Sequence, residues 1–405
     1  MTHITTSDKT PRELGYRMPA EWEQQTSVWL QWPRKHPASL AANDFSYQMK
    51  MEKIWMLMSW EIHQQIRLEI LAGSDAQRSH IFAAMNYYGF NMTRISIHVT
   101  HTVDVWHRDT GPIFVVDDNG GIAATDWNFN GWGSYPEWAE AEGHIPQTVA
   151  GILNLPLFVA PLISEGGAIE VNGSGSLMAT RSSIINDNRN PDMSQQQVEQ
   201  ALSDYLGIDN FIWLSGAPAA VCENKLGDGT DYHIDIAARF TDRNKVLYAW
   251  TDDESDPRYP YLVKHLEELQ HATDELGNPL ILQPLYLPAG GVYAIGDRYD
   301  PTLGSGSNFT DASYLNYLVT NNIVLLPAFG NANDNRAQAV LAECFPERRI
   351  IPIPVVSLTA EGGAIHCVTQ HQPAPSFAPD PAVEPRDDGS HSHSGGSRNP
   401  VDFDD

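Results

Sequence analysis

Cys367 is the residue whose type and setting most directly suggest covalent chemistry in this 405-residue chain. It lies in Ala360-Glu-Gly-Gly-Ala-Ile-His-Cys-Val-Thr, where the glycine pair lets the backbone approach a ligand or adopt a positive φ. We expect the cysteine at the far end of a short strand. A thiolate there would be a nucleophile. A free cysteine is also a common small core residue, so the local sequence leaves both interpretations open.

A nucleophilic cysteine needs a proton acceptor, and the adjacent His366 is the obvious candidate. Neighbouring side chains of a strand point to opposite faces, however, so we do not expect His366 to be the partner. His233 is a better candidate, because His233 and Asp235 are two apart in a β-prone run and would share one face. An imidazole beside a carboxylate suits proton transfer next to a bound cation. The alternative is a satisfied polar pair at a strand end.

A third segment, Asp104-Val-Trp-His-Arg-Asp-Thr-Gly-Pro, carries Asp109 just before a Gly-Pro break and close to Trp106. Trp127 and Trp132 follow in Asp126-Trp-Asn-Phe-Asn-Gly-Trp-Gly. Carboxylates form bidentate, charge-assisted hydrogen bonds with a planar guanidinium, and aromatic faces can flank such a cation. Tryptophans are also frequent core residues, so each of them has a packing interpretation as well.

Alternating strands and helices must position these side chains. Residues 194–206 predict a helix with a capping box and a terminal Gly207, and residues 334–345 predict a second amphipathic helix that holds Cys344 in the core. Apolar runs at 245–250 and 323–327 predict buried strands. The sequence Glu165-Gly-Gly-Ala-Ile recurs unchanged from Glu361, each time leading into a β-prone stretch. This repeat indicates related supersecondary units, with chance recurrence of a Gly-rich turn as the alternative.

Composition excludes several classes of protein. The formal net charge of −26 disfavours nucleic acid and anionic membranes as partners, and it is compatible with a cationic small molecule. Three cysteines without CxxC spacing argue against a disulfide framework and a zinc site, and Cys222 has no histidine partner suggested by the sequence. No stretch resembles a membrane span or a secretory signal, so the expected location is the cytoplasm.

We expect one catalytic domain over residues 1–373. Residues 374–405 are rich in Pro, Ser, Gly, His and Asp, with seven acids and two arginines, and predict a disordered acidic tail. His391 and His393 in this tail could contact a metal, but a linker is the expected state. The sequence leaves open whether the chain forms a homo-oligomer.

Taken in order, these segments resemble the agmatine deiminase family, which includes the bacterial peptidylarginine deiminases within the guanidino-group-modifying (pentein) superfamily. The resemblance runs from about Gly15 to Gln372. The matching motifs are Met18-Pro-Ala-Glu-Trp-Glu, Trp29-Leu-Gln-Trp-Pro, Val105-Trp-His-Arg-Asp-Thr-Gly-Pro, Asp126-Trp-Asn-Phe-Asn-Gly-Trp-Gly, Glu165-Gly-Gly-Ala-Ile, Asn188-Arg-Asn-Pro, the His233–Asp235 segment, Ser313-Tyr-Leu-Asn-Tyr, Pro327-Ala-Phe-Gly and Gly362-Gly-Ala-Ile-His-Cys-Val-Thr-Gln.

The resemblance implies an α/β fold: a five-bladed propeller with pseudo-fivefold symmetry and a central active-site channel. It implies that Asp109 and Asp235 hold the guanidinium nitrogens, that Cys367 attacks the central carbon, and that His233 is the general acid and base. Trp106, Trp127, Glu165 and Asn316 would help to bind the substrate. The implied reaction passes through a covalent S-alkylthiouronium intermediate, with no metal and no cofactor. Its product would be N-carbamoylputrescine, on a route to putrescine and other polyamines.

The nucleophile loop departs from the family pattern. That loop usually reads Gly-Gly-Gly-Asn before Ile-His-Cys, whereas here it reads Glu361-Gly-Gly-Ala, and residues 288–310 match poorly. We therefore expect hydrolysis of agmatine, and keep peptidyl arginine, free arginine and other alkylguanidines as alternative substrates. An amidinotransferase and a binding protein on an inactive propeller are the other classes considered. The presence of all four proposed catalytic residues argues against the inactive propeller.

Overall fold

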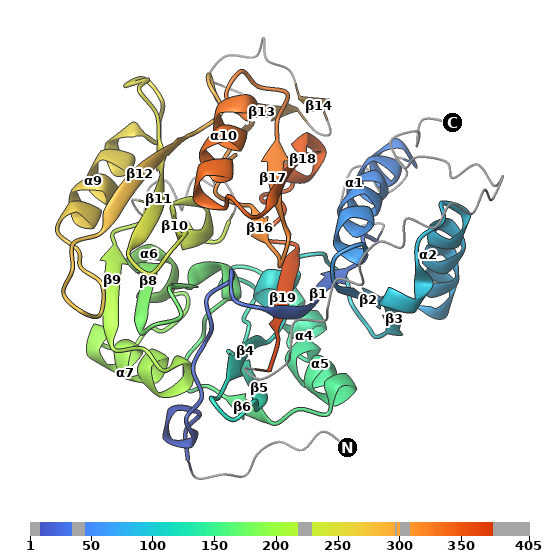
Figure 1. Ribbon diagram of the computed structural model, residues 1–405, viewed down its shortest axis with the longest axis horizontal. Helices are drawn as coiled ribbons and strands as arrows, with labels where there is room; N and C mark the ends of the chain where they lie inside the picture. The colour runs from blue at the N-terminus through green and yellow to red at the C-terminus, as the bar shows by residue number, and fades with distance from the viewer. Residues whose placement is uncertain (1–8, 35–44, 218–228, 296–297, 300–307, 376–405) are drawn as a thin grey trace.

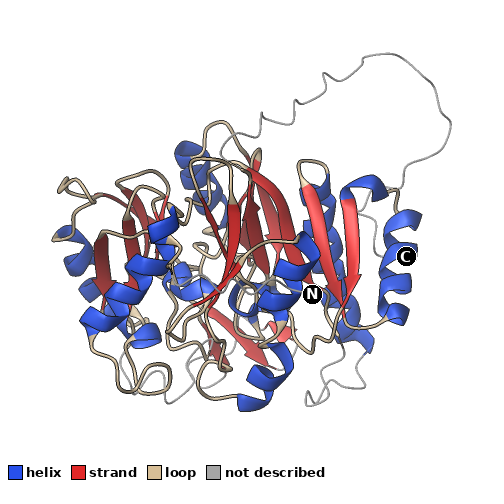
Figure 2. Cartoon of the chain, turned by 90° about the horizontal axis from the view of Figure 1, so that it is seen from below, coloured by secondary structure: helices blue, strands red, loops and turns tan. Residues whose placement is uncertain are grey.

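Units built on one plan surround a common centre in this protein (Figure 1). The computed structural model describes residues 9–34, 45–217, 229–295, 298–299 and 308–375. In each unit a first strand pairs antiparallel with a second, and the second pairs parallel with a third. A parallel pair needs a long crossover, and helices supply it on the outer side of the strands (Figures 1 and 2). Within the described residues there are five such units, so the fold is the expected five-bladed α/β propeller.

Four of the units follow one another along the chain. The two predicted strands are confirmed as β11 and β17, the central strands of their units, where both neighbours shield the backbone. The strands of the four units are β4 (Ile113–Val116), β5 (Ile122–Asp126) and β6 (Leu157–Val159); β7 (Glu170–Val171), β8 (Ser176–Thr180) and β9 (Asn210–Leu214); β10 (Ala238–Phe240), β11 (Lys245–Trp250) and β12 (Ile281–Tyr286); β16 (Leu318–Val319), β17 (Ile323–Ala328) and β18 (Arg349–Pro354).

The fifth unit joins the two ends of the described chain. Its first strand, β19 (Thr369–Pro373), pairs antiparallel with β1 (Gln25–Gln31). The sheet continues in parallel through β2 (Arg67–Ala72) to β3 (Ile95–Val99). This pairing closes the ring, because it gives the first and last strands a shared sheet in place of two free edges.

Helices lie between and outside the strands. The helix predicted at 194–206 is confirmed as α7, which has the capping box on Ser194 and ends at Gly207 with φ +72°. The helices are α1 (Phe45–His63), α2 (Asp75–Tyr87), α3 (His107–Thr110), α4 (Pro136–Glu142), α5 (Ile145–Leu153), α6 (Arg181–Ile184), α7 (Gln195–Leu206), α9 (Tyr259–Gln270), α10 (Asp334–Cys344) and α11 (Val356–Thr359), with 3₁₀ turns η1 (Arg12–Leu14), η2 (Met92–Arg94), η3 (Gly166–Ala168) and η4 (Ile234–Ile236).

A small separate sheet is inserted between the third and fourth units. It consists of β13 (Val292–Ile295), β14 (Arg298–Tyr299) and β15 (Asn308–Thr310), all paired antiparallel. It falls in the stretch that matches the family pattern poorly. Residues 376–405 of the tail predicted at 374–405 lie outside the described residues, as does Cys222.

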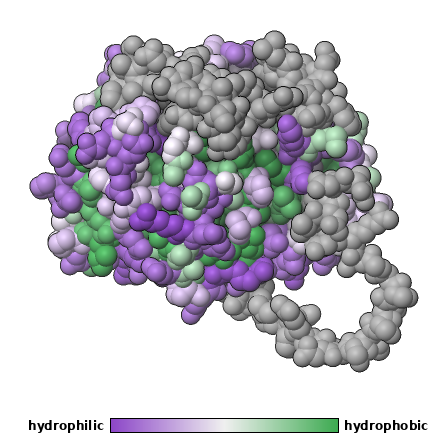
Figure 3. Space-filling view, turned by 90° about the horizontal axis from the view of Figure 1, so that it is seen from above, coloured by the Kyte–Doolittle hydropathy of each residue, from purple (hydrophilic) through white to green (hydrophobic). Residues whose placement is uncertain are grey.

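The apolar side chains of the strands are buried between the units and under the helices. All four residues of β4 are buried, as expected where a sheet is covered on both faces. The second predicted helix is α10, and its Cys344 is half-buried against the main core, as predicted. Hydrophilic residues cover much of the described surface in Figure 3, with hydrophobic ones showing between them. No helix in the described ranges is both long and apolar enough to cross a membrane.

Candidate active site

Each of the five first strands is preceded by a short turn, and these turns meet at the centre of the propeller. Helix α3 precedes β4, η3 precedes β7, and η4 precedes β10. In the other two units, the turn at 313–317 precedes β16 and the turn at 361–368 precedes β19. The repeated Glu-Gly-Gly-Ala-Ile element supplies two of these five turns. Residues far apart in sequence therefore come together because the same local element recurs in each unit.

Cys367 lies buried in the last of these turns, with 6% of its surface exposed. It precedes β19, so the expectation of a cysteine at the far end of a strand is wrong. Its Sγ lies 3.1 Å from Nδ2 of Asn316, whose Oδ1 accepts a hydrogen bond from the Cys367 amide at 3.2 Å. Burial, together with the charges of Asp235 and Asp109, raises the pKa of the thiol well above its usual range. These surroundings therefore favour the protonated thiol as long as no positive charge offsets the two carboxylates.

Asp109 and Asp235 are both buried next to this thiol. Asp109 accepts hydrogen bonds from the Trp132 indole at 2.9 Å and from the Gly167 amide at 3.0 Å. Asp235 Oδ2 lies 3.6 Å from the cysteine Sγ, while its Oδ1 is buried with no hydrogen-bond partner among the described residues. An orphaned carboxylate oxygen costs free energy in a protein interior. The carboxylate pair is therefore suited to receive a donor-rich cation.

His233 belongs to the same cluster. The structure places it as the residue before a 3₁₀ turn, so the prediction that His233 and Asp235 share the face of a strand is wrong. The turn nevertheless directs both side chains inward. His233 Nε2 lies 3.2 Å from Glu165 Oε2, and Nδ1 lies 3.8 Å from Asp109 Oδ1. Burial lowers the pKa of His233, but the charges of Asp109, Glu165 and Asp235 outweigh it and raise the pKa to about 9.

Gly167 shows that these groups face one point. A Cβ added there would lie 2.5 Å from His233 Nδ1, 2.9 Å from Asp109 Oδ1 and 3.3 Å from Asp235 Oδ2. Any side chain would clash with the imidazole, so only glycine fits between them. The sequence signal for this position was the Gly-Gly pair of the repeat, but the pair alone did not show what the backbone approaches.

Glu165 contacts His233 on one side and the buried Arg189 on the other. Arg189 donates from Nε to Glu165 Oε1 at 2.6 Å and from Nη1 to the Trp132 carbonyl at 2.6 Å. Burial would raise the pKa of Glu165, but Arg189 and His233 lower it below its usual value. Glu165 therefore stays ionised and orients the imidazole of His233. Its contacts are with His233 and Arg189.

His366 occupies a role that sequence reasoning missed. Its ring nitrogens lie 2.8 Å from Asp235 Oδ2 and 2.8 Å from Glu21 Oε2, so the ring bridges the two carboxylates. Burial and the charges of Arg108 and Arg239 lower the pKa of His366. Glu21 in turn lies 3.0 Å from Nη2 of Arg239. His366 thus fixes the orientation of the Asp235 carboxylate beside Cys367. Only its adjacency to Cys367 singled it out in sequence, and no local pattern connects it to Glu21.

The two tryptophans predicted to flank the substrate lie in different places. Trp106 immediately precedes α3 and reaches the cysteine turn: a Cβ on Gly363 would lie 2.6 Å from the Trp106 ring and 3.0 Å from the cysteine Sγ. Trp127 instead packs in a separate apolar cluster, edge to face with Tyr205, and its indole donates to Thr125 at 2.7 Å. The structure therefore brings Trp106 to the site and gives Trp127 a core position. Trp132 takes the polar contact with Asp109.

A buried thiol, an imidazole and two carboxylates meet at the centre of this five-bladed α/β propeller, and together they can hold a guanidinium group and attack its carbon. The chain belongs to the Porphyromonas-type peptidyl-arginine deiminase family, whose sequence model matches residues 17–373. It is 33% identical over 385 residues to the agmatine deiminase of Stutzerimonas stutzeri, covering 92% of this chain and 99% of that one. It is 32% identical to that of Pseudomonas aeruginosa, over 91% of this chain and 98% of the relative.

A solved structure shares the fold over almost the same span. The agmatine deiminase of Enterococcus faecalis superposes with a TM-score of 0.80 at 27% identity, covering 92% of this chain and 99% of that one. The fold described above is thus shared with an agmatine deiminase of known structure.

Proposed function

We propose that this protein hydrolyses agmatine to N-carbamoylputrescine and ammonia, with Cys367 as nucleophile. The observation that carries the proposal is the buried thiol beside two carboxylates, one of which has an orphaned oxygen. The agmatine deiminases that cover nearly the whole chain support the choice of agmatine.

Asp109 and Asp235 bind the guanidinium in this proposal. A planar guanidinium presents several N–H donors, and carboxylates on either side can accept them while they offset its charge. Burial raises the pKa of Asp109 to about 6, still low enough for a carboxylate near neutral pH. For Asp235, burial is outweighed by the hydrogen bond and charge of His366, so its pKa is lowered. Both groups are therefore anionic when the cation arrives.

Substrate binding also activates the nucleophile. The charges of Asp235 and Asp109 help to hold the thiol pKa high in the free enzyme. A guanidinium between them offsets those charges, so the pKa of Cys367 falls, the thiol releases its proton to solvent as the substrate binds, and the thiolate forms beside the carbon it attacks. The cation thus controls when the cysteine becomes reactive.

The reaction then proceeds in two halves. The thiolate Sγ bonds to the guanidinium carbon, and protonated His233 gives its proton through Nδ1 to the departing nitrogen, so the C–N bond breaks and ammonia leaves. The S-alkylthiouronium remains on Cys367. Neutral His233 next accepts a proton from water, whose oxygen attacks the same carbon. The C–S bond breaks while the proton of the newly added hydroxyl passes to the departing sulfur, so the ureido product leaves and the Cys367 thiol is restored.

Product analysis tests the reaction and its substrate together. Purified protein is incubated with agmatine, free arginine, an arginine peptide and simple alkylguanidines, while ammonia and the organic product are measured. Ammonia with an equimolar ureido compound from agmatine is the expected result. A new guanidino compound in the presence of an amine would instead show amidino transfer, and turnover of another guanidine with agmatine inert would refute the substrate assignment.

Glu165→Gln should shift the pH profile of turnover. Glu165 is one of the anions that raise the pKa of His233 to about 9, and activity requires protonated His233 as the first acid. Removing the Glu165 charge lowers that pKa, so the alkaline limb of kcat/KM should move to lower pH, by about one unit. The profile is measured by ammonia release between pH 6 and 10. An unchanged alkaline limb with only a lower rate would show that Glu165 does not tune His233.

A further inference from the structure

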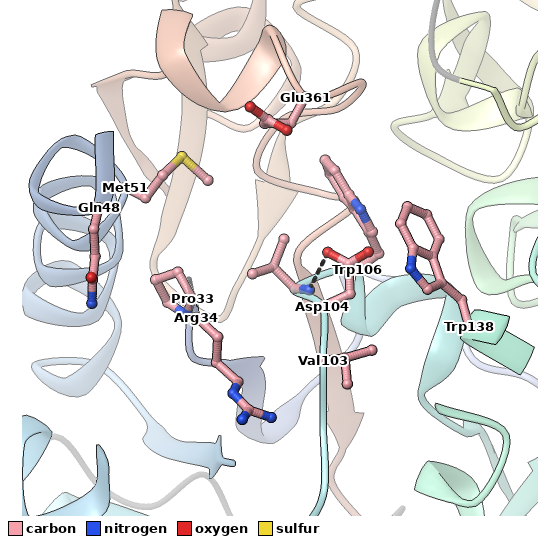
Figure 4. Close-up of a pocket in the computed structure, with 10 residues that line it drawn as sticks. Pro33, Arg34, Gln48, Met51, Val103, Asp104, Trp106, Trp138 and Glu361 are labelled. Atoms are coloured by element: carbon pink, nitrogen blue, oxygen red, sulfur yellow. Dashed lines mark hydrogen bonds between the residues drawn. The ribbon is translucent and has the colours of Figure 1, made fainter. Parts of the chain in front are cut away.

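A cavity of about 130 Å³ opens beside the catalytic cluster, between the N-terminal segment and the segment that leads into α3 (Figure 4). Engineered cavities of about 150 Å³ accommodate a benzene-sized molecule, so the space suits a short alkyl chain with a polar end. The side chains used below are Asp104, Trp106, Trp138, Glu361 and Arg34.

The cavity carries carboxylates in excess of the cations that could offset them. Asp104 Oδ1 accepts from the Val105 amide at 2.8 Å, but its Oδ2 is buried with no hydrogen-bond partner among the described residues. Burial, with smaller contributions from the neighbouring charges of Glu142 and Glu361, raises the pKa of Asp104 to about 7. The group that would relieve this unfavourable burial is a cation within the cavity.

The described cation in the lining does not supply that charge to Asp104 or Glu361. Arg34 donates from Nη1 to the carbonyl of Thr102. In Figure 4 its guanidinium points away from the side on which Glu361 lies. The two carboxylates thus share the cavity with the aromatic rings of Trp106 and Trp138. Carboxylates together with indole faces are the chemistry that binds an alkylammonium.

Trp106 connects this cavity to the reacting sulfur. Its ring lines the cavity, and it also lies against Gly363, where an added Cβ would be 3.0 Å from the cysteine Sγ. A substrate with its guanidinium carbon at Cys367 therefore has its chain directed along Trp106.

We propose that the cavity between Asp104, Glu361, Trp106 and Trp138 binds the ammonium end of a dicationic guanidine. The inference rests on the proposed function, because it places the far end of the substrate whose guanidinium reacts at Cys367. It also predicts that free arginine is a poor substrate. The carboxylate of arginine would meet two like charges, and such a juxtaposition strongly disfavours the wrong ligand.

Glu361 is the part of this subsite that is particular to the chain. The family pattern has glycine at this position of the nucleophile loop, so the second carboxylate is a departure that strengthens selection for a positively charged tail. Glu361 lies at the exposed rim of the cavity, where its replacement by glutamine removes charge without opening the core.

The test compares agmatine with butylguanidine, which has the same chain and guanidinium but no ammonium group. In the unaltered protein, kcat/KM for agmatine should exceed that for butylguanidine by about 100-fold. Glu361→Gln should reduce this ratio about tenfold, chiefly through a higher KM for agmatine. Asp104→Asn should reduce the agmatine-to-butylguanidine ratio more than Glu361→Gln does, because Asp104 is more deeply buried than Glu361.

Glu137→Gln is the matched control, since Glu137 is an exposed carboxylate on α4 outside the cavity lining. It should leave the ratio within twofold and so exclude a general effect of lost negative charge. If the ratio is unchanged in both Glu361→Gln and Asp104→Asn, the subsite is wrong while the reaction stands. Butylguanidine reports the guanidinium chemistry without the tail, so lack of turnover of every guanidine would contradict the proposed function instead.

Discussion

Cys367→Ser is expected to lower kcat for agmatine by about 10⁴-fold, because no other group replaces the thiolate as nucleophile. A serine hydroxyl has a far higher pKa than a thiol, and Asp235 and Asp109 further disfavour an anion at this position. Substrate binding should persist, since the carboxylates that hold the guanidinium remain. Turnover is measured by ammonia release, and agmatine binding by calorimetry.

The control for this variant is Cys344→Ser. Cys344 is half-buried at the end of α10, outside the catalytic cluster, so its replacement should leave kcat within twofold. Thermal unfolding of both variants verifies that the fold is retained. Turnover of Cys367→Ser at the rate of the unaltered protein would refute nucleophilic catalysis by this residue and leave Cys367 as a structural thiol.

Asp235→Asn is expected to lower kcat/KM for agmatine by about 10³-fold. The carboxylate is buried and ionised, with Oδ2 bonded to His366 and Asn316 and Oδ1 unpaired. An amide in its place loses the charge that binds the guanidinium and turns donor groups toward a donor-rich ligand. Losing one partner of a buried charge pair costs about 3–5 kcal/mol, which corresponds to this change in rate.

The same substitution should lower turnover but raise the reactivity of Cys367 in the substrate-free protein. Asp235 is one of the charges that raise the pKa of Cys367, so its removal lowers that pKa and increases the thiolate fraction near neutral pH. Iodoacetamide should therefore alkylate Cys367 faster in Asp235→Asn than in the unaltered protein without substrate, even though turnover falls.

Asp126→Asn provides the comparison for Asp235→Asn. Asp126 is also a buried aspartate, but it ends β5 and accepts a hydrogen bond from Gln147, away from the thiol. Its replacement should alter neither turnover nor alkylation by more than twofold. A slower alkylation of Cys367 in Asp235→Asn would contradict the assigned electrostatic coupling between the carboxylate and the thiol.

The sequence by itself predicted the local elements and the types of residue at the site. The capping box at Ser194 and the terminal Gly207 delimit α7 correctly, because both signals act within one turn of helix. The buried strands β11 and β17 follow from short apolar runs. The repeated Glu-Gly-Gly-Ala-Ile element correctly indicated related units, since both copies precede the first strand of a unit. Resemblance to the family then named Asp109, His233, Asp235 and Cys367 as one set.

Tertiary structure alone decided how those residues meet. The segment at His233 and Asp235 is β-prone, yet it forms a 3₁₀ turn, because its pairing with β11 begins only at Ala238. Trp127 is packed in the core, whereas Trp132 donates to Asp109, and nothing in their shared segment distinguishes them.

The bridge from Asp235 through His366 to Glu21 joins residues separated by more than 100 positions. Such contacts depend on burial and charge brought together by the closed ring of five units. These are properties of the folded chain that local sequence patterns do not encode.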